Sequence, residues 1–310
     1  MIGSPAPCKP VGAGFAWGHH GELLQGVFRL NGVGPARPAR GLLTLPCPLF
    51  WSKACFTPGS GPASSVIVHP PDKTKACRAA ARALRQLGAP QAGRLEIVSN
   101  IPPGRGLGSS TADVTAALRA VFDAYGAPLL ASEAARLAVA AETASDAIMF
   151  WEGPASPAVL FAQREGCVIE AFTGPLPPLL VLGFDAAPRA QGVDTLRMTL
   201  PTYSLGEQAE FERLRAQARQ SILAGDAMLM GQVATRSAML NQPYLPTPGF
   251  EQWLEIARAC RAIGVQVAHS GTVAGLLFDA RDEDAQRRLR QARAQLADAG
   301  VRRVWRYQAG

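Results

Sequence analysis

The sequence predicts an α+β protein made of two domains, and three observations carry this prediction. The chain has 310 residues, enough to bury two ordinary hydrophobic cores. Segments of helical and strand periodicity alternate irregularly, without the regular rhythm of a doubly wound parallel sheet. The tract TGPLPP at 173–178 separates two apolar strand-like segments and is a candidate hinge. We therefore expect an N-terminal domain over 1–177 and a C-terminal domain over 178–310.

The first half of the chain predicts a loop at 32–41, because Gly and Pro dominate this stretch between two early strands. A strand-like segment at 42–56 follows, and then a second loop at 58–64. An Ala-rich helix over 73–87 is ended by Gly88. The remaining elements expected before the hinge are a strand at 94–101, a long helix that ends before Gly126, a helix over 132–142, and strands at 158–162 and 166–172.

The pattern restarts after the hinge and stays irregular. The elements expected here are strands at 179–184, 264–269, 274–279 and 301–306, and helices over 206–223, 227–240, 249–263 and 282–299. The chain contains no internal repeat, so a solenoid or propeller is not expected.

The composition excludes several classes of protein. With 48% hydrophobic and 18% charged residues the chain is typical of a globular protein, and no apolar run reaches the ~18 residues that span a bilayer. The first residues lack the basic and apolar regions of a signal peptide, so we expect a cytoplasmic protein without a membrane partner. Six cysteines are scattered without the spacing of a zinc site.

The formal net charge is +7, and much of the basic content lies in Ala- and Arg-rich helical stretches. Such spacing is typical of a solvated helix face. The stretches lack interleaved aromatic residues and no nucleic-acid motif is present, so we expect no nucleic-acid partner. A basic surface would mildly attract an anionic ligand.

One segment carries most of the information about function. Residues 101–113 read IPPGRGLGSSTAD, with glycines at 104, 106 and 108. These glycines let the backbone curl so that successive N–H groups converge on one anion. An amphipathic helix follows, and Ser110 with Asp113 fits the S-x-x-D signature of a helix start. A Gly-rich loop that leads into a helix N-terminus predicts an anion site.

Two familiar phosphate loops do not fit this segment. No Lys-Ser/Thr pair closes it, so it is not a Walker A loop, and the third glycine of GxGxxG would fall at Ser109. A tight strand-to-helix turn without a ligand is the structural alternative. The combination of strand, glycines, serines and amphipathic helix argues against that alternative.

The segment PPGRGLGSSTA resembles the central ATP-binding motif of the GHMP kinases, a superfamily that includes galactokinase, homoserine kinase and mevalonate kinase. The resemblance implies an N-terminal α+β domain that binds ATP and a C-terminal ferredoxin-like domain, with ATP and Mg²⁺ as cofactors. It places Ser110 at the metal ion. The residues that it places around the nucleotide phosphates are Pro103, Gly104, Arg105, Gly106, Leu107, Gly108, Ser109 and Ser110.

Two flanking segments extend the resemblance. GHHGELLQG at 18–26 stands where the family has its first motif, and VAHSGTVAGLL at 267–277 stands where it has a Gly-rich third motif. Both segments resemble those of one subgroup, the L-threonine kinases that supply O-phosphothreonine for the aminopropanol linker of cobalamin. SAMLNQ at 237–242, VDT at 193–195 and LPCP at 45–48 fit the same subgroup.

Phosphoryl transfer needs in-line positioning, magnesium and a group that accepts the hydroxyl proton. The segment ETASD at 142–146 supplies two carboxylates, the first of them 32 residues after Ser110. By resemblance, Glu142 is a magnesium ligand with Ser110, and Asp146 lies at the acceptor hydroxyl as a base or an orienting charge. The alternatives are a surface carboxylate at a helix end for Glu142 and an ordinary turn residue for Asp146.

The acceptor is expected to lie between the first and third motifs. Glu22 and Gln25 are candidates for binding its ammonium group and polar atoms, and a polar edge-strand position is their alternative. His20, Ser270 and Gly271 are also placed at the acceptor, and Gly271 would let the backbone approach the phosphate loop closely.

The first motif departs from the family pattern. His20 stands where the threonine kinases are expected to have a small or thiol residue, His19 adds a second bulky group, and no lysine lies between Gly12 and Lys53. L-Threonine is the expected acceptor, with another hydroxylated amino acid or a secondary metabolite as the first alternative. A protein that binds nucleotide without turnover is the second alternative, although the intact loop and both acids argue against it. The sequence does not show the oligomeric state, and a homodimer is left open.

Overall fold

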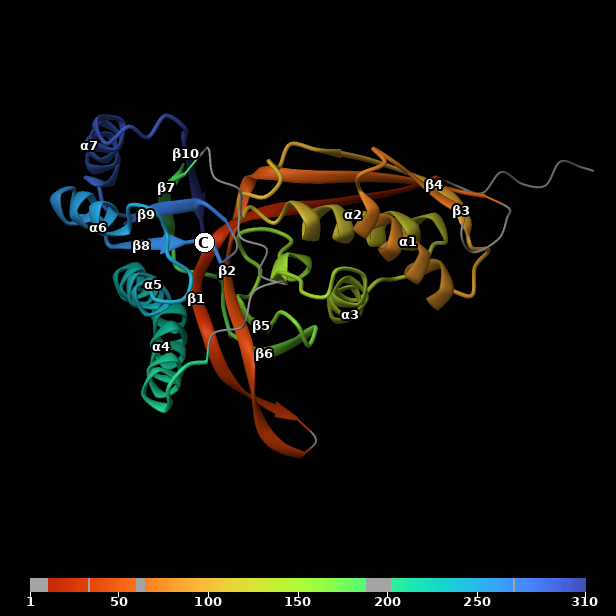
Figure 1. Ribbon diagram of the computed structural model, residues 1–310, viewed down its shortest axis with the longest axis horizontal. Coiled ribbons are helices and arrows are strands. Elements are labelled where there is room, and N and C mark those ends of the chain that lie inside the picture. Colours follow the sequence, from red (N-terminus) through yellow and green to blue (C-terminus); the bar gives the residue numbers. More distant parts are fainter. Residues whose placement is uncertain (1–10, 33, 60–64, 188–201, 270) are drawn as a thin grey trace, which may run out of the picture.

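The computed structural model describes residues 11–32, 34–59, 65–187, 202–269 and 271–310, and it confirms the predicted α+β class (Figure 1). Its strands form one sheet and are β1 (Gly12–Gly32), β2 (Gly34–Pro58), β3 (Ser65–His69), β4 (Ala92–Ser99), β5 (Val159–Ala162), β6 (Cys167–Ala171), β7 (Leu179–Asp185), β8 (Gly264–Val267), β9 (Val273–Asp279) and β10 (Val304–Ala309). Its helices are α1 (Thr74–Gln86), α2 (Ser109–Ala124), α3 (Ala131–Glu142), the 3-10 helix η1 (Ala147–Phe150), α4 (Leu205–Ala224), α5 (Ala227–Asn241), α6 (Phe250–Ala259) and α7 (Ala285–Asp298). None of the helices in these ranges is both long and apolar enough to cross a membrane.

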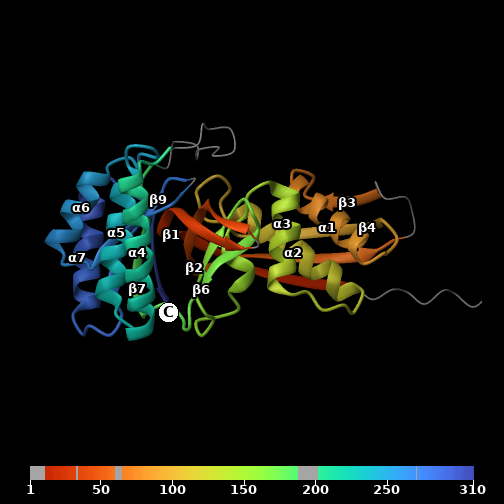
Figure 2. The same ribbon diagram turned by 90° about the horizontal axis from the view of Figure 1, so that it is seen from below.

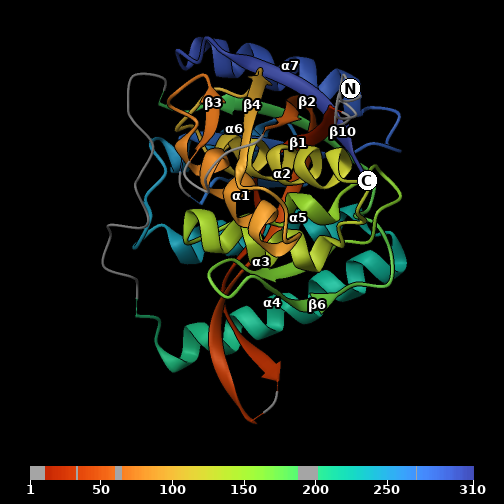
Figure 3. The same cartoon turned by 90° about the vertical axis from the view of Figure 1, so that its right-hand side faces the viewer.

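β1 and β2 form a long antiparallel hairpin that projects beyond the rest of the molecule (Figures 1 and 3). The predicted loop at 32–41 is therefore wrong for residues 34–41, which belong to β2. Pro38 pairs with Arg29, and Arg37 pairs with Leu30. Around Pro38 the described strands pair β2 with β1 alone, and β5 joins only from Gly41 onward, so a proline without an N–H removes no bond to a third strand there.

The helices gather in two groups around the sheet (Figure 2). Helices α1, α2 and α3 share one hydrophobic cluster with apolar residues of β1, β2 and β4. Helices α4 and α5 share a second cluster with the hairpin and β7, and α6 and α7 share a third with β7, β8 and β9. Successive residues of β7 point to opposite faces of the sheet, so Leu179 and Val181 pack in the second cluster and Leu180 and Leu182 pack in the third.

The C-terminal half has the expected ferredoxin-like strand order. Its strands lie in the order β10-β7-β9-β8 and pair antiparallel throughout, with the last strand beside the first. The sheet continues from β8 to β1 through one residue pair, Glu22 with Val267. The sheet thus crosses the proposed boundary between 177 and 178, whose position stays a prediction. Glu22 lies at the junction of the two halves.

The first motif lies wholly within β1, but this part of the strand is irregular. The pairing of β1 with β2 shifts register between Trp17 and Gly18, and again on both sides of Glu22. Gly21 has φ of +65°, and a side chain there would come 2.8 Å from the carbonyl oxygen of Val267. Such bulges change the direction in which side chains point from a strand.

Several predicted boundaries move by a few residues. Helix α6 ends at Ala259 instead of 263, α7 begins at Ala285 instead of 282, and β10 begins at Val304 instead of 301. Strand β3 was not predicted; it is a short edge strand that pairs in parallel with β4. A five-residue strand beside a loop has too weak a periodic pattern to be distinguished from its surroundings.

Candidate active site

The Gly-rich segment joins β4 to the N-terminus of α2, as expected. Gly104, Gly106 and Gly108 have φ of 69°, 79° and 72°, a left-handed conformation that favours glycine. Gly108 is the residue before the helix, and Ser109 and Ser110 form its first turn. The first N–H groups of a helix have no partner within it, so this turn can bind an anion.

The predicted S-x-x-D helix start is wrong, because the residue that caps α2 is Gly108, two positions before Ser110, and a glycine has no side chain that could accept a hydrogen bond. Asp113 is turned instead toward β2 and α1. Its carboxylate accepts a 2.7 Å hydrogen bond from Ser52 Oγ and forms a 2.7 Å ion pair with Lys73 Nζ. Lys73 and Lys75 line a pocket with Ser109 and Ser110 beside the loop. Sequence reasoning missed both lysines, whose only signal was their position at the start of an Ala-rich helix.

The third motif packs directly on this phosphate loop. A Cβ atom on Gly106 would lie 2.5 Å from Ala268 Cβ, and one on Gly271 would lie 2.0 Å from the Arg105 carbonyl oxygen. The Thr272 N–H donates a hydrogen bond to that same carbonyl. The close approach expected at Gly271 is therefore present, whereas Ser270 lies outside the described residues.

Ser110 and Glu142 come together at the end of α3. Ser110 Oγ donates a 2.6 Å hydrogen bond to Glu142 Oε2, and Thr111 Oγ1 donates a 2.9 Å bond to Oε1. Glu142 is only 3% exposed, so it is not a surface carboxylate. Burial raises the pKa of Glu142 to about 7, although both hydroxyl groups lower it.

The chain then turns back sharply toward α2. Thr143, directly after Glu142, has φ of 75°, which is unusual for a β-branched residue. This turn returns the backbone so that Asp146 Oδ2 lies 3.2 Å from Thr111 Oγ1. Thr111 Oγ1 therefore lies within hydrogen-bonding distance of both acids, Glu142 and Asp146, and donates its single proton to one of them at a time.

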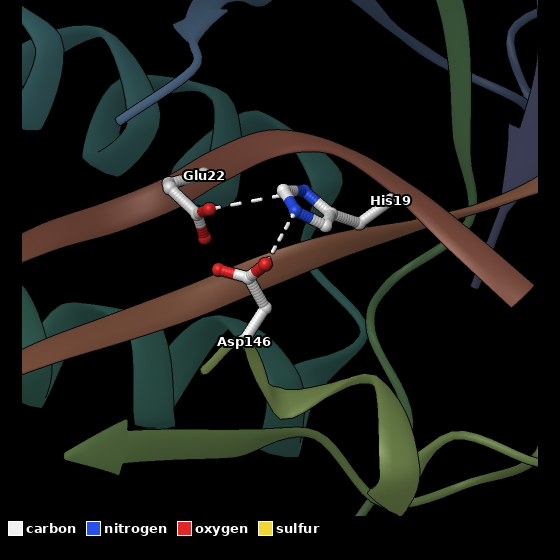
Figure 4. A group of neighbouring side chains, drawn as sticks. All are labelled: His19, Glu22 and Asp146. Carbon is white, nitrogen blue, oxygen red and sulfur yellow. Dashed lines mark ion pairs between the residues drawn. The ribbon is translucent and has the colours of Figure 1, made fainter. Parts of the chain in front are cut away.

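On its other side Asp146 meets the first motif (Figure 4). His19 Nε2 lies 3.1 Å from Asp146 Oδ2, and His19 Nδ1 lies 3.8 Å from Glu22 Oε1. The Gly21 N–H also donates to Nδ1 when that nitrogen carries no proton. Neither carboxylate oxygen of Glu22 has a hydrogen-bond partner in the described part of the chain, although its side chain is fully buried.

The charges in this cluster depend on one another. Burial lowers the pKa of His19, but Asp146 and Glu22 outweigh it and raise this pKa to about 9. Burial likewise opposes ionisation of Asp146, yet His19 and Thr111 hold its pKa below the usual range. Burial raises the pKa of Glu22 to about 7, against the attraction of His19.

Two predicted acceptor residues are placed differently. His20 is fully buried away from the acids: its Nδ1 lies 2.7 Å from Gln266 Nε2, and its ring packs against Trp305. Neighbouring strand residues face opposite sides, so His19 and His20 cannot both reach the acceptor. Gln25 does lie nearby, but its Oε1 is 3.0 Å from His269 Nδ1 and is thus already engaged.

Behind His269 lies a small polar recess that sequence reasoning did not find. It is lined by Gln25, Arg40, Gln163, Tyr203 and Asn241, and the Arg40 guanidinium lies over the Tyr203 ring. Arg40 had been assigned to a loop, so nothing in the sequence linked it to the site.

Two family models match the chain. The one described as GHMP kinases N terminal domain matches residues 74–153, and the one described as GHMP kinases C terminal matches residues 218–297. They match in the expected order, and the first includes the phosphate loop with Glu142 and Asp146.

Two curated proteins are similar over most of the chain. An L-threonine kinase of Salmonella typhimurium is 27% identical over 212 residues, which are 68% of this chain and 67% of that protein. A homoserine kinase of Moorella thermoacetica is 31% identical over 204 residues, 63% of this chain and 66% of that protein. The matched segments thus span about two thirds of each relative's length.

Solved structures show the same fold. The crystal structure of a homoserine kinase from Cytophaga hutchinsonii superposes with a TM-score of 0.67, covering 100% of this chain and 97% of the other. The identity is 14%, so this likeness concerns the fold alone.

Proposed function

Since the chain belongs to the GHMP kinase family, we propose that it transfers the γ-phosphoryl group of ATP to the hydroxyl group of an amino acid, with L-threonine as acceptor. One observation carries the proposal: Thr111, in the first turn of the phosphate-binding helix, lies within hydrogen-bonding distance of Glu142 at the end of α3 and of Asp146, which faces the first motif. The groups needed for the phosphoryl donor and for the acceptor are thereby held in one network.

The nucleotide is expected along the phosphate loop. GHMP kinases bind ATP, and the loop N–H groups, the first turn of α2 and the two lysines all suit its phosphates. Ser110, which lines this pocket, and Glu142, to which it is hydrogen-bonded, offer hard oxygen atoms, the ligand type that Mg²⁺ prefers. When bound, Mg²⁺ neutralises charge on the transferred phosphoryl group.

The acceptor hydroxyl is expected at Asp146. Because its pKa is held low, this carboxylate is ionised and accepts a hydrogen bond from the hydroxyl, which orients the oxygen toward the phosphoryl group. Glu22 is proposed to bind the ammonium group of the acceptor. A buried carboxylate without hydrogen bonds is costly alone, and an ammonium group would satisfy it.

The choice of L-threonine rests on the amino-acid sequences of the first and third motifs and on the L-threonine kinase among the relatives. L-Homoserine is the second candidate, because a homoserine kinase matches a similar share of the chain at slightly higher identity. Both acceptors carry an ammonium and a carboxylate group, so the Glu22 site does not separate them.

The test is an ADP-release assay with MgATP and L-threonine, L-serine, L-homoserine or mevalonate. We expect the highest kcat/KM with L-threonine, and a loss of about a hundredfold or more in Ser110→Ala and Asp146→Asn. Ser132→Ala and Asp298→Asn are the matched controls and should keep wild-type rates, because both side chains are exposed and make no hydrogen bond or ion pair with the described part of the chain.

Three outcomes would separate the alternatives. Preference for another amino acid would keep the chemistry and correct the acceptor. Turnover of mevalonate alone would overturn the amino-acid class. Tight ATP binding with no ADP release on any acceptor would leave a nucleotide-binding protein without this activity.

A further inference from the structure

His19 touches both halves of the proposed reaction centre. Its backbone N–H donates a 3.1 Å hydrogen bond to the Leu107 carbonyl oxygen in the phosphate loop. Its ring lies against Gly108, where an added Cβ atom would come 2.3 Å from His19 Cδ2. The same ring carries the nitrogen that contacts Asp146. One side chain therefore spans the space between the loop and the acceptor carboxylate.

The two ring nitrogens have different partners. Nε2 contacts Asp146, whereas Nδ1 faces Glu22 and the Gly21 N–H, as the dashed lines in Figure 4 show for the two acids. These three side chains lie close enough together to hold a metal ion. However, an imidazole binds a given ion through one nitrogen only, and here its two nitrogens are directed at different carboxylates. The ring lies between two acids, which favour its protonated form, and in that form the Gly21 N–H no longer donates to Nδ1.

We propose that His19 is a positioning residue, which fixes Asp146 against the phosphate loop and supplies the positive charge that keeps this carboxylate ionised. The inference rests on the proposed function, because it assigns His19 a role in the same reaction. Nothing in the sequence motifs assigns such a role, since His19 stood out there only as a bulky departure from the family pattern.

The surrounding charges explain why a cation is needed at this position. Asp146 is close to two further buried acids, Glu22 and Glu142, and each repels its ionised form. The other histidines whose charge would act on His19 are His20, the next residue along the strand, and His269 beyond β8, and burial keeps both neutral by lowering their pKa to about 3 and about 4. His19 is thus the one cation in contact with Asp146 among the described residues.

The sign of the pH effect follows from these contacts. His19 carries its charge below its raised pKa of about 9 and loses it above that pH. If the charge is removed by mutation, the pKa of Asp146 rises, and the carboxylate form is then lost on the acid side. A change in packing alone would lower the rate by the same factor at every pH.

The experiment measures kcat against pH at saturating MgATP and acceptor for wild type, His19→Gln and His19→Lys. Gln keeps an N–H donor but no charge, and we expect kcat near pH 7 to fall about ten- to hundredfold and to recover as the pH rises. Lys restores a cation, so kcat near pH 7 should return to within about threefold of wild type and should depend on pH as in the wild type.

Loss of the same factor at every pH in His19→Gln, or no recovery in His19→Lys, would overturn the proposal. So would a stoichiometric transition metal found by elemental analysis in the wild type and absent from His19→Gln. Calorimetric titration with ATP checks that each variant still folds and binds nucleotide.

A second measurement needs neither a variant nor turnover. The chain contains four histidines, so ring ¹⁵N NMR can follow each one during a pH titration of the wild-type protein. We expect one ring to titrate near pH 9 and to shift to lower pH in Asp146→Asn. If no histidine ring titrates above pH 8, the role proposed for His19 is contradicted, whichever acceptor the protein uses. If one ring does titrate there but the protein is inactive on every acceptor, only the proposed function is contradicted.

Discussion

Ser110 Oγ donates a 2.6 Å hydrogen bond to Glu142 Oε2 across 32 residues of sequence. The bond joins the first turn of α2 to the last residue of α3, and Thr111 adds a second bond to the other carboxylate oxygen. Both oxygen atoms of a buried acid therefore lie within hydrogen-bonding distance of hydroxyl groups, and the residue that supplies one of these groups, Ser110, lines the phosphate pocket. A divalent cation bound here would be held by the Glu142 carboxylate and the Ser110 hydroxyl oxygen, and it would take the place of the hydrogen bond between them.

Glu142→Gln keeps the size and hydrogen-bonding ability of the side chain but removes its charge. We expect kcat to fall about a hundredfold or more and the Mg²⁺ concentration for half-maximal rate to rise, because one anionic ligand is lost. Glu255→Gln, at an exposed position on α6, is the control. The magnesium assignment fails if a Mg²⁺ titration gives the same half-maximal concentration for Glu142→Gln and wild type.

Two glycines of the phosphate loop form a matched pair for a test of its packing. Both have positive φ, but a Cβ atom at Gly104 meets nothing within 4 Å, whereas one at Gly106 overlaps Ala268. Gly104→Ala should lower the free energy of unfolding by about 1 kcal/mol through backbone strain alone. Gly106→Ala should lower it by about 2–4 kcal/mol and should also raise the KM for MgATP.

Urea unfolding and KM measurements compare the two variants. Equal effects on both quantities would mean that the contact between the phosphate loop and the third motif does not constrain the nucleotide site.

The raised pKa of Glu22 and its proposed contact with the ammonium group predict how kcat/KM depends on pH and on the amino group of the acceptor. Its carboxylate form appears as the pH rises through about 7, so kcat/KM for L-threonine should rise over this range while the ammonium group stays protonated. (R)-3-Hydroxybutyrate, which is L-threonine without its amino group, should be a poorer acceptor and should lack this dependence.

The variant Glu22→Gln completes the comparison. It should lower kcat/KM for L-threonine about tenfold to a hundredfold and leave the value for hydroxybutyrate nearly unchanged. An equal loss for both acceptors would show that Glu22 does not bind the ammonium group.

Lys75 is the second lysine of the phosphate pocket and, unlike Lys73, forms no ion pair with another residue in the described ranges. Lys75→Met should raise the KM for MgATP about fivefold and should weaken its dependence on ionic strength, because a charge that attracts the phosphates is removed. Lys53→Met is the matched control, since the Lys53 ammonium group lies over the Trp51 ring outside this pocket. A KM unchanged between 50 mM and 500 mM salt in both wild type and variant would contradict this role.

Local patterns predicted the helices and the phosphate loop well. The helix predicted over 73–87 corresponds to α1, and the one over 132–142 corresponds to α3 with a shift of one residue. Both are Ala-rich with helical spacing and a clear end signal, so few long-range contacts were needed to define them. The same local rules were wrong for 34–41, because a proline-containing edge strand has the composition of a loop.

The residues of the candidate site likewise fall into those that the sequence identified and those that only the structure revealed. Resemblance in short motifs identified Ser110, Glu142 and Asp146, whose roles stay predictions. It misplaced His20, and it gave no role to His19, Lys73 or Lys75. Motif spacing shows which residue types are present, but it does not show which way a side chain points from an irregular strand.

The order of glycines, serines and apolar residues along 101–124 was enough by itself to predict an anion-binding loop and the helix after it, because these are properties of neighbouring residues. Which groups surround that loop was decided only when the chain folded. The register shifts of β1 direct His19 and Glu22 to one side of the strand, and the turn at Thr143 brings Asp146 back to meet them. Contacts between residues more than a hundred positions apart depend on strand register and packing, and no local sequence pattern encodes them.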